Sequence, residues 1–440
     1  MPFRDHRPET RTLLSAQLVF NIGFYAVVPF LAGAMATEYG LGAAAIGLVL
    51  GARTFSQQGM FLLGGMLADR WGARRAILAG CLVRIVGYAT LAAASDFALF
   101  FLGAVLTGAG GALFSPALES RLSHADQPAG TEDPSGASRS RRSVFVWLAI
   151  TGEIGAVLGP VVGSVLLGWG FDAALAAGIG VFAAVTVLLW YLLPAEPVPL
   201  PSDREAEVPA PAPSAAAPRW AFLRDRRFVL FCALAGMNML AYNQLYFAVP
   251  VELSRRGLDG ARLAALFLLA SGLTLLLQLP VSAAGRRMGP GRALAVGFVL
   301  EAGAFALAAL TAMHPGAAAG SMAPLAGTVT VLILGHMLLT PTILSLIPRF
   351  VPDRGSTSGR GAYYGLAATC GGIAVLAGNA VLGQLFDLTD RHHWWPGIPW
   401  MPLVVLALLA AAALPVVLRG HSTTRPADAS STTAPAGRTR

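Results

Sequence analysis

Ionisable side chains interrupt several long apolar stretches of the sequence, among them Glu153, Arg53 and Arg84. A charged side chain at the centre of a bilayer costs about 2.5–3.5 kcal/mol even on a lenient scale. A carboxyl group kept there must face water or carry a proton, which suits a group that binds and releases protons. We expect Glu153 to couple protons or to hold a cationic substrate, with Arg53 and Arg84 as further coupling candidates. The alternative is a static ion pair between Glu153 and one of the arginines.

A second group of polar and aromatic side chains recurs at helical spacing within the apolar stretches. Arg53 and Gln57, for example, are four residues apart and share one helix face. Such groups at mid-depth suit a roomy site for an amphipathic organic solute. The alternative is that they form hydrogen bonds which only hold helices together, and for His336 that it is a packing donor. The candidate cavity residues are Gln17, Asn21, Tyr25, Gln57, Asn238, Tyr242, Asn243, Tyr246 and His336.

The elements that must position these residues are membrane-spanning helices. The chain is 55% hydrophobic and only 12% charged, whereas a soluble domain has about 25% charged residues. A span needs about 20 mostly apolar residues, so we predict an all-α membrane protein with twelve transmembrane helices. The predicted spans are Leu13–Met35, Ile46–Leu67, Ala76–Ala94, Phe97–Leu118, Val144–Gly168, Ala173–Leu193, Phe228–Val251, Leu263–Ala283, Ala293–Met313, Ala326–Leu346, Gly361–Phe386 and Trp400–Leu418.

The distribution of arginine predicts the orientation of these spans. All 31 basic residues are arginines. If both termini are cytoplasmic, 25 arginines fall in cytoplasmic segments and four, Arg255, Arg256, Arg262 and Arg391, in external loops. The opposite orientation would violate the positive-inside bias. We therefore expect a multi-pass protein of a bacterial plasma membrane with both ends in the cytoplasm.

A Pro- and Ala-rich segment divides the spans into two sets of six. We expect an N-terminal bundle over residues 1–193, a solvated cytoplasmic linker over 194–225, a C-terminal bundle over 226–418 and a disordered tail over 419–440. Ser123–Arg142 is polar and is expected to be a mobile loop. Weak similarities between the halves keep order and spacing, as in the loop Gly64–Arg75 and its counterpart Gly285–Arg292. Such repeats are typical of transporters with a site between two halves.

The loop Gly64–Arg75 reads GGMLADRWGARR. It resembles the signature G-x-L-A-D-R-x-G-R-K of the major facilitator superfamily, with Ala73 where a basic residue is usual. Gly155–Gly163 (GAVLGPVVG) is similar to the G-x-x-x-G-P-x-x-G signature of the drug/proton antiporters. Together with Gly47–Asp69 and Gly108–Pro116, these motifs look closest to the MdtH-type multidrug efflux branch. The resemblance covers essentially the whole chain and implies the major facilitator fold of two six-helix bundles.

The resemblance also implies two structural roles. The loop and its partner would form a conformational latch that closes in the outward-facing state; its residues are Gly65, Asp69, Arg70, Gly72, Arg74 and Glu119. Gly65 would allow close packing near residues 358–362, and Arg74 would pair with Glu119. A glycine seam would pack against the span Leu263–Ala283; its residues are Gly155, Gly159, Pro160 and Gly163. One family feature is missing, because Ala104 stands where many proton antiporters carry arginine. The alternatives are a plain positive loop and ordinary helix packing.

These observations predict a secondary active exporter of small organic compounds, driven by proton antiport and working by alternating access. The alternative is a proton-coupled symporter or facilitator for a sugar, peptide or organic acid. It stays open because position 104 is Ala and lacks the arginine of many proton antiporters. We expect small-molecule substrate, protons and the lipid bilayer as partners, and a monomer. The sequence has no lysine and no nucleotide-binding signature, and its scattered polar groups do not resemble an enzyme's active site. We expect no cofactor, no metal and no nucleic acid, and the three cysteines, Cys81, Cys232 and Cys370, read as apolar residues.

Overall fold

The computed structural model describes residues 6–125, 134–194, 221–314, 320–351 and 360–422. Within these ranges the chain is helical, with short 3-10 turns and no strand. The helices of the N-terminal half are α1 (Pro8–Val27), α2 (Leu31–Thr37), α3 (Ala43–Gln58), α4 (Phe61–Trp71), α5 (Ala73–Ala92), α6 (Phe97–Ala125), α7 (Pro134–Leu166) and α8 (Phe171–Leu192). Those of the C-terminal half are α9 (Arg226–Asn243), α10 (Ala248–Arg255), α11 (Gly260–Met288), α12 (Pro290–Thr311), α13 (Ala323–Leu346), α14 (Arg360–His392) and α15 (Met401–Ser422).

Eleven helical segments of the described chain are long and apolar enough to cross a membrane. The predicted count of twelve spans is not confirmed, because the second span, Ile46–Leu67, is not one continuous helix. Its residues form α3 and α4, which are separated by Gly59 and Met60. Gly59 costs helix stability relative to other residues, so the chain can bend there between the two shorter helices.

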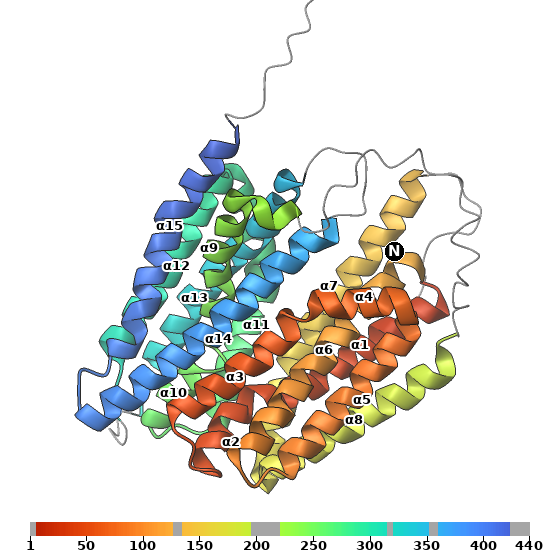
Figure 1. Ribbon diagram of the computed structural model, residues 1–440. Coiled ribbons are helices and arrows are strands. Elements are labelled where there is room, and N and C mark those ends of the chain that lie inside the picture. Colours follow the sequence, from red (N-terminus) through yellow and green to blue (C-terminus); the bar gives the residue numbers. More distant parts are fainter. Residues whose placement is uncertain (1–5, 126–133, 195–220, 315–319, 352–359, 423–440) are drawn as a thin grey trace, which may run out of the picture.

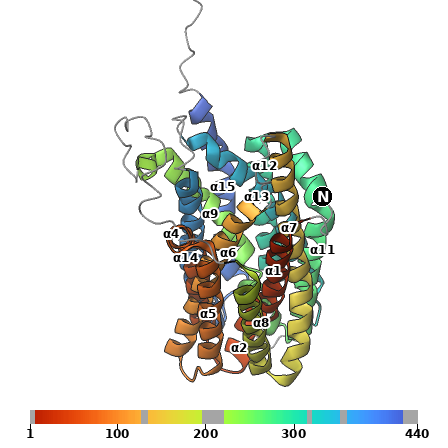
Figure 2. The ribbon, with the colours of Figure 1, turned by 90° about the vertical axis from the view of Figure 1, so that its right-hand side faces the viewer.

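The two halves lie side by side (Figure 1). Most helices of both halves run roughly along one common direction (Figure 2). The longest contact between the halves joins α3 to α14, and a second joins α7 to α11. In Figure 1 the ribbons of the two halves approach each other near α2, α3 and α10 and diverge toward α4 and the start of α14. We call the first of these regions the far end and the second, which carries the loop Gly64–Arg75, the loop end.

Corresponding glycines shape equivalent turns in the two halves. Gly72 joins α4 to α5 with φ +88° and ψ 145°, and Gly289 joins α11 to α12 with φ +77° and ψ 157°. Residues with a Cβ rarely adopt such angles. The two glycines lie in the two segments that the sequence comparison paired, so the repeat extends to backbone geometry.

Three predicted segment boundaries change. The predicted loop Ser123–Arg142 is partly helical, since α6 continues to Ala125 and α7 already begins at Pro134. The predicted tail over 419–440 begins later, because α15 continues to Ser422. Most of the predicted linker, residues 195–220, lies outside the described residues.

Candidate substrate and coupling site

Two buried arginines from neighbouring helices come together in the N-terminal half. Arg53 on α3 and Arg84 on α5 are 6% and 1% exposed. The guanidinium carbon of Arg53 lies 4.8 Å from the centre of the Phe24 ring, and that of Arg84 lies 5.2 Å from the same centre. Arg53 Nη2 also donates a hydrogen bond of 2.7 Å to Gln57 Oε1. Arg53, Arg84, Gln57 and Tyr88, which is one turn beyond Arg84 on α5, are called the arginine cluster below.

Aromatic rings cover Arg84, but no acid neutralises it. Its guanidinium carbon lies 4.5 Å from the ring centre of Phe20 and 5.4 Å from that of Phe182. Among the described residues, no carboxylate forms an ion pair with Arg53 or Arg84. The alternative prediction of a static pair between Glu153 and one of these arginines is therefore wrong for this conformation.

Three polar residues of the C-terminal half form a closed hydrogen-bond triad. His336 Nδ1 lies 2.9 Å from Asn238 Oδ1, Asn238 Nδ2 donates to Thr340 Oγ1 at 3.1 Å, and Thr340 Oγ1 lies 3.2 Å from His336 Nε2. All three bonds are satisfied when a neutral imidazole carries its proton on Nδ1 and the threonine hydroxyl donates to Nε2. The Tyr242 ring stacks on the imidazole with centroids 4.2 Å apart.

Tyrosines from both halves meet between these two clusters. Tyr25 on α1 interacts through its hydroxyl with Tyr246, and the Tyr246 ring centre lies 6.2 Å from that of Tyr242. Glu153 on α7 is partly exposed and acts electrostatically on Tyr25 and Tyr242. Glu153 therefore lies beside groups of both halves, and no ion pair fixes it within the described chain.

The other predicted cavity residues are placed in different surroundings. Asn21 lies against α7, close to Gly155. Gln17 is partly exposed, and its buried Oε1 has no hydrogen-bond partner in the part of the chain that the structure describes. Asn243 lies in the contact between the halves, where its Nδ2 donates to Thr54 Oγ1 at 3.1 Å.

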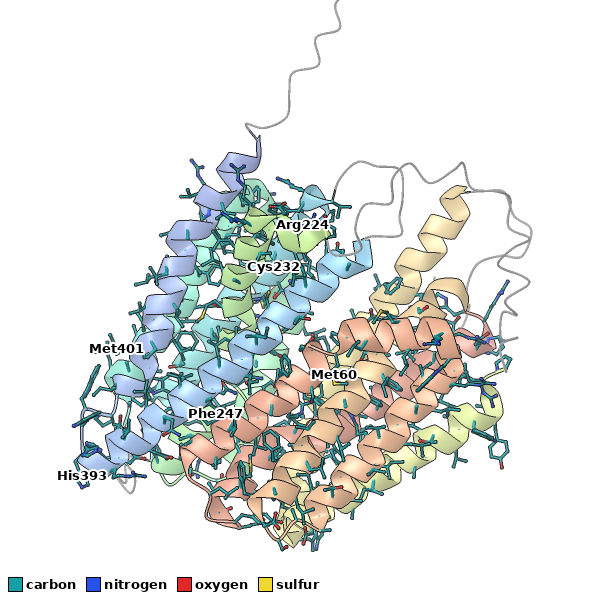
Figure 3. All side chains as sticks on the ribbon, viewed as in Figure 1. Met60, Arg224, Cys232, Phe247, His393 and Met401 are labelled. Atoms are coloured by element: carbon teal, nitrogen blue, oxygen red, sulfur yellow. The ribbon has the colours of Figure 1, made fainter. Side chains whose placement is uncertain are left out.

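The contact between α3 and α14 continues from that asparagine toward the far end. Asn379 Nδ2 donates to Asn243 Oδ1 at 2.8 Å, and Gln244 Nε2 donates to Asn379 Oδ1 at 3.0 Å. Phe247, labelled in Figure 3, lies so close to Gly47 of α3 that an added Cβ there would be 2.9 Å from its ring. Met60, also labelled in Figure 3, marks the break after which α4 turns away from α14.

At the far end, a carboxylate of one half caps a helix of the other. The helix α3 begins after Gly42, which has no side chain to accept its first amide protons. Asp387 of α14 supplies the acceptors, because Ala43 N donates to Oδ1 at 2.8 Å and Ala44 N donates to Oδ2 at 3.0 Å. Negative charge at a helix N-terminus is favourable, so Asp387 holds the two halves together here.

The loop end lacks the predicted latch contacts. A side chain at Gly65 would meet no described atom within 4 Å, whereas its neighbour Gly64 packs against Ala112. The close packing predicted at Gly65 belongs to the outward-facing state and is not made among the described residues of this conformation. Arg74 does not pair with Glu119, which is exposed, but donates to the carbonyl oxygen of Trp190 at 2.6 Å. The Asp69 side chain lies outside the described residues, as do residues 358 and 359 of the expected partner segment 358–362, and Arg70 is exposed.

The glycine face of α7 packs against α1. Added Cβ atoms at Gly155, Gly159 and Gly163 would overlap Asn21, Tyr25 and the Ala26 carbonyl respectively. The resemblance predicted α11 as the partner of this seam, which is wrong. The helix α7 also contacts α11. Pro160 lies within α7 without ending it.

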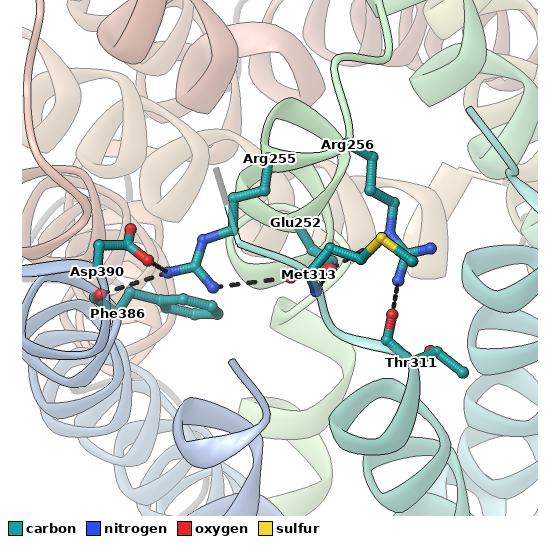
Figure 4. Close-up of polar contacts among 7 residues, drawn as sticks. All are labelled: Glu252, Arg255, Arg256, Thr311, Met313, Phe386 and Asp390. Carbon is teal, nitrogen blue, oxygen red and sulfur yellow. Dashed lines mark hydrogen bonds and ion pairs between the residues drawn. The ribbon is translucent and has the colours of Figure 1, made fainter. Parts of the chain in front are cut away.

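A buried ionic network joins three helices of the C-terminal half at the far end. Figure 4 shows its members, which are Glu252, Arg255, Arg256, Thr311, Met313, Phe386 and Asp390. Glu252 is fully buried and lies 3.2 Å from Arg256 and 3.8 Å from Arg255, while Arg255 lies 2.5 Å from Asp390. Arg256 also donates to the Thr311 carbonyl oxygen. Arg255 and Arg256 were expected in an external loop; instead they tie α10 to α12 and α14.

Within the described residues, no group of three or more His, Cys, Asp or Glu side chains is arranged to hold a metal ion. The described cysteines are all free thiols.

A family model for the Major Facilitator Superfamily matches residues 13–378. The chain belongs to this superfamily. An uncharacterized MFS-type transporter of Mycobacterium tuberculosis is 33% identical over 420 residues, which cover 94% of each chain. The multidrug resistance protein MdtH of Escherichia coli (strain K12 / DH10B) is 27% identical over 410 residues, which cover 91% of this chain and 92% of MdtH. The chain is therefore an MFS transporter of the membrane.

Solved structures show the same MFS fold. The peptide transporter POT in complex with sulfate has a TM-score of 0.74 at 17% identity and covers 95% of this chain and 96% of its own. A POT family transporter in complex with 5-aminolevulinic acid has a TM-score of 0.72 at 13% identity and covers 95% of this chain and 97% of its own. At these identities the likeness concerns the fold alone.

Sequence reasoning missed several residues of this MFS transporter's central region. Tyr88 is four residues after Arg84, so helical spacing could have placed it on the same face. Phe20 and Phe24 are four residues apart on the predicted first span and could have been read as one aromatic face. Asn379 and Thr54 had no sequence signal, because their partners are far away in the chain.

Proposed function

We propose that this MFS transporter is a secondary active exporter of small organic compounds that exchanges outward-moving substrate for inward-moving protons. The observation that carries the proposal is Glu153, a carboxyl group inside a membrane-spanning helix, without a fixed ion pair, beside tyrosines of both halves. A carboxyl group in that position can bind either a proton or the polar part of a substrate. The multidrug resistance protein MdtH as a relative supports export.

We further propose that the structure represents the inward-facing state of alternating access. The arginine-rich loop end is cytoplasmic by the positive-inside bias. The halves are joined at the far end by Asp387 of α14, which caps the start of α3, and by the hydrogen bonds of Asn243 and Asn379. The predicted latch contact between Arg74 and Glu119 is open at the loop end. In this account the far-end contacts break, and the latch through Asp69 forms, when the transporter turns outward.

The remaining predictions fit into this proposal. Residues 1–193 and 226–418 act as the two moving bundles, joined by the cytoplasmic linker 194–225. The transporter works as a monomer in a bacterial plasma membrane, with both termini in the cytoplasm. Gln17, Asn21, Tyr25, Tyr242, Tyr246 and His336 contact substrate during the cycle, because they lie on the helices whose side chains meet between the bundles.

A second candidate is proton-coupled uptake or facilitated transport of a small metabolite. The specific observation in its favour is Ala104, a buried residue of α6 at the position where many proton antiporters carry arginine. Coupling would then run in the opposite direction, with proton and substrate moving together.

The test is gradient-driven transport in proteoliposomes whose protein has the loop end outward. A panel of lipophilic compounds with positive, zero and negative charge is added outside. Antiport predicts accumulation when the lumen is acidic, and Glu153→Gln abolishes it while leaving exchange of substrate for substrate. Asp259→Asn, an exposed carboxylate at the start of α11, is the matched control and keeps full accumulation. Accumulation only with an alkaline lumen would favour the symporter.

A further inference from the structure

The arginine cluster contains an unusual excess of buried hydrogen-bond donors. Arg53 Nε, Arg84 Nε and Arg84 Nη1 are buried and have no hydrogen-bond partner among the described residues. The hydroxyl group of Tyr88, a residue 1% exposed, is also without a partner. Buried polar groups are nearly always hydrogen-bonded, and exceptions point to an unseen partner or a functional role.

These unpaired donors belong to one cluster. The guanidinium carbons of Arg53 and Arg84 lie 4.8 and 5.2 Å from one ring centre, that of Phe24, so they are at most about 10 Å apart. Tyr88 acts electrostatically on both arginines, and Arg53 acts on Arg84. The donors therefore come from α3 and α5 toward a shared region.

The charge of the cluster is not balanced by any acid in the described part of the chain. No described carboxylate pairs with either arginine, and the rings of Phe20, Phe24 and Phe182 offer weaker compensation than an acid. Two unpaired cations away from water are costly unless a counterion is present. An anion bound among these donors would supply both the missing charge and the missing acceptors.

We propose that the arginine cluster binds the carboxylate or phosphonate group of an organic anion, and that such anions are substrates of this transporter. Carboxylates and phosphonates suit the planar donors of arginine, which can hold two oxygens at once. The aromatic rings around Arg84 suit an apolar or aromatic body next to the acidic group. The cluster also reaches the contact between the halves, because Arg53 acts electrostatically on Tyr25 and Tyr246. The step from binding to export rests on the proposed function.

The binding test compares three compounds that share one ring system: 1-naphthoate, 1-naphthylmethanol and 1-naphthylmethylamine. They present an anion, a neutral group and a cation of similar size. Equilibrium dialysis against the purified full-length transporter in detergent, without any gradient, measures their affinities. We expect 1-naphthoate to bind at least about tenfold more tightly than the alcohol, and the amine to bind weakest, because hydrogen bonds to charged groups are worth about that factor or more.

Variants then assign the binding to the cluster. Arg53→Gln and Arg84→Gln are expected to weaken 1-naphthoate binding at least about tenfold and Tyr88→Phe by several fold, while the alcohol binds unchanged. Arg262→Gln, an exposed arginine in the first turn of α11, is the matched control and binds as the wild type does. If Arg84→Gln fails to give folded protein, Arg53→Gln and Tyr88→Phe carry the same comparison.

The proposal is overturned if the acid and the alcohol bind equally, if the amine binds tightest, or if Arg53→Gln and Tyr88→Phe leave 1-naphthoate binding unchanged. Its failure is separable from failure of the proposed function. Selective 1-naphthoate binding without gradient-driven export would uphold the anion site and refute export. Export of cationic compounds that is unchanged in Arg53→Gln and Tyr88→Phe would uphold export and refute the anion site.

Discussion

The contact of Asp387 with the start of α3 predicts that removing this carboxylate shifts the far end from its closed toward its open conformation. Replacing Asp387 by Ala removes two backbone-to-carboxylate hydrogen bonds, at 2.8 and 3.0 Å, and leaves the first amides of α3 without acceptors. Loss of an N-cap costs about 0.5–2 kcal/mol. Since these bonds exist only when the halves are together at the far end, we take about 1–2 kcal/mol as the loss for the closed state. That loss shifts the closed-to-open ratio by about 5- to 30-fold.

Spin labels on opposite halves measure this shift. Thr37 at the end of α2 and Arg391 at the end of α14 are both exposed at the far end, and cysteines there, in a background without the native cysteines, report the distance between the halves. Asp387→Ala is expected to increase the long-distance population by that factor. Asp172→Ala is the matched control, because Asp172 lies at the same end on α8 and forms no ion pair across the halves within the described residues. A folded Asp387→Ala protein with the wild-type distance distribution would refute the reasoning.

Three further predictions concern packing and hydrogen bonding. Gly159→Val forces α7 away from Tyr25 and is expected to cost about 1–3 kcal/mol of stability. Gly180→Val is the control and is expected to cost much less, because an added Cβ at Gly180 would meet no described atom within 4 Å. Equal melting temperatures of the two variants would contradict this prediction. Glu252→Gln leaves buried Arg256 without its acid, while Arg255 keeps Asp390, and is expected to cost about 3 kcal/mol of stability. The cost is measured as loss of binding-competent protein on heating; a variant as stable as the wild type would show that the network is dispensable. His336 is expected to show the neutral Nδ1–H form by nitrogen NMR, and a pure Nε2–H signal would contradict the triad.

Much of the fold was predictable because apolar length and arginine placement are local properties of the sequence. The one missed feature of the second span is its break, although Gly59 was visible; a glycine inside an apolar stretch is common in membrane helices, so it gave no clear warning. The end of α6 and the early start of α7 were missed because polar residues were read as loop, whereas a helix can continue beyond the bilayer into water.

The candidate site was predictable only in part, because its partners are brought together by packing. Arg53, Arg84 and Glu153 stand out as charges in apolar stretches, and their rarity there pointed to function. The cap of α3 by Asp387 could not be read from sequence, because the two segments are 343 and 344 residues apart. The seam of Gly155 and its neighbours was assigned to the wrong helix for the same reason: spacing shows which face is small but not which helix meets it.

In the proposed antiport cycle, Glu153 takes up a proton when substrate leaves and gives it up when substrate binds. This exchange is tested most directly by a pH-sensitive dye in the lumen of proteoliposomes that have an acidic lumen and the loop end outward. Adding a transported compound outside is expected to make the wild-type lumen more alkaline as protons leave, and to have no such effect in Glu153→Gln. Substrate movement with no change of lumen pH in the wild type, or an equal change in the variant, would contradict the account.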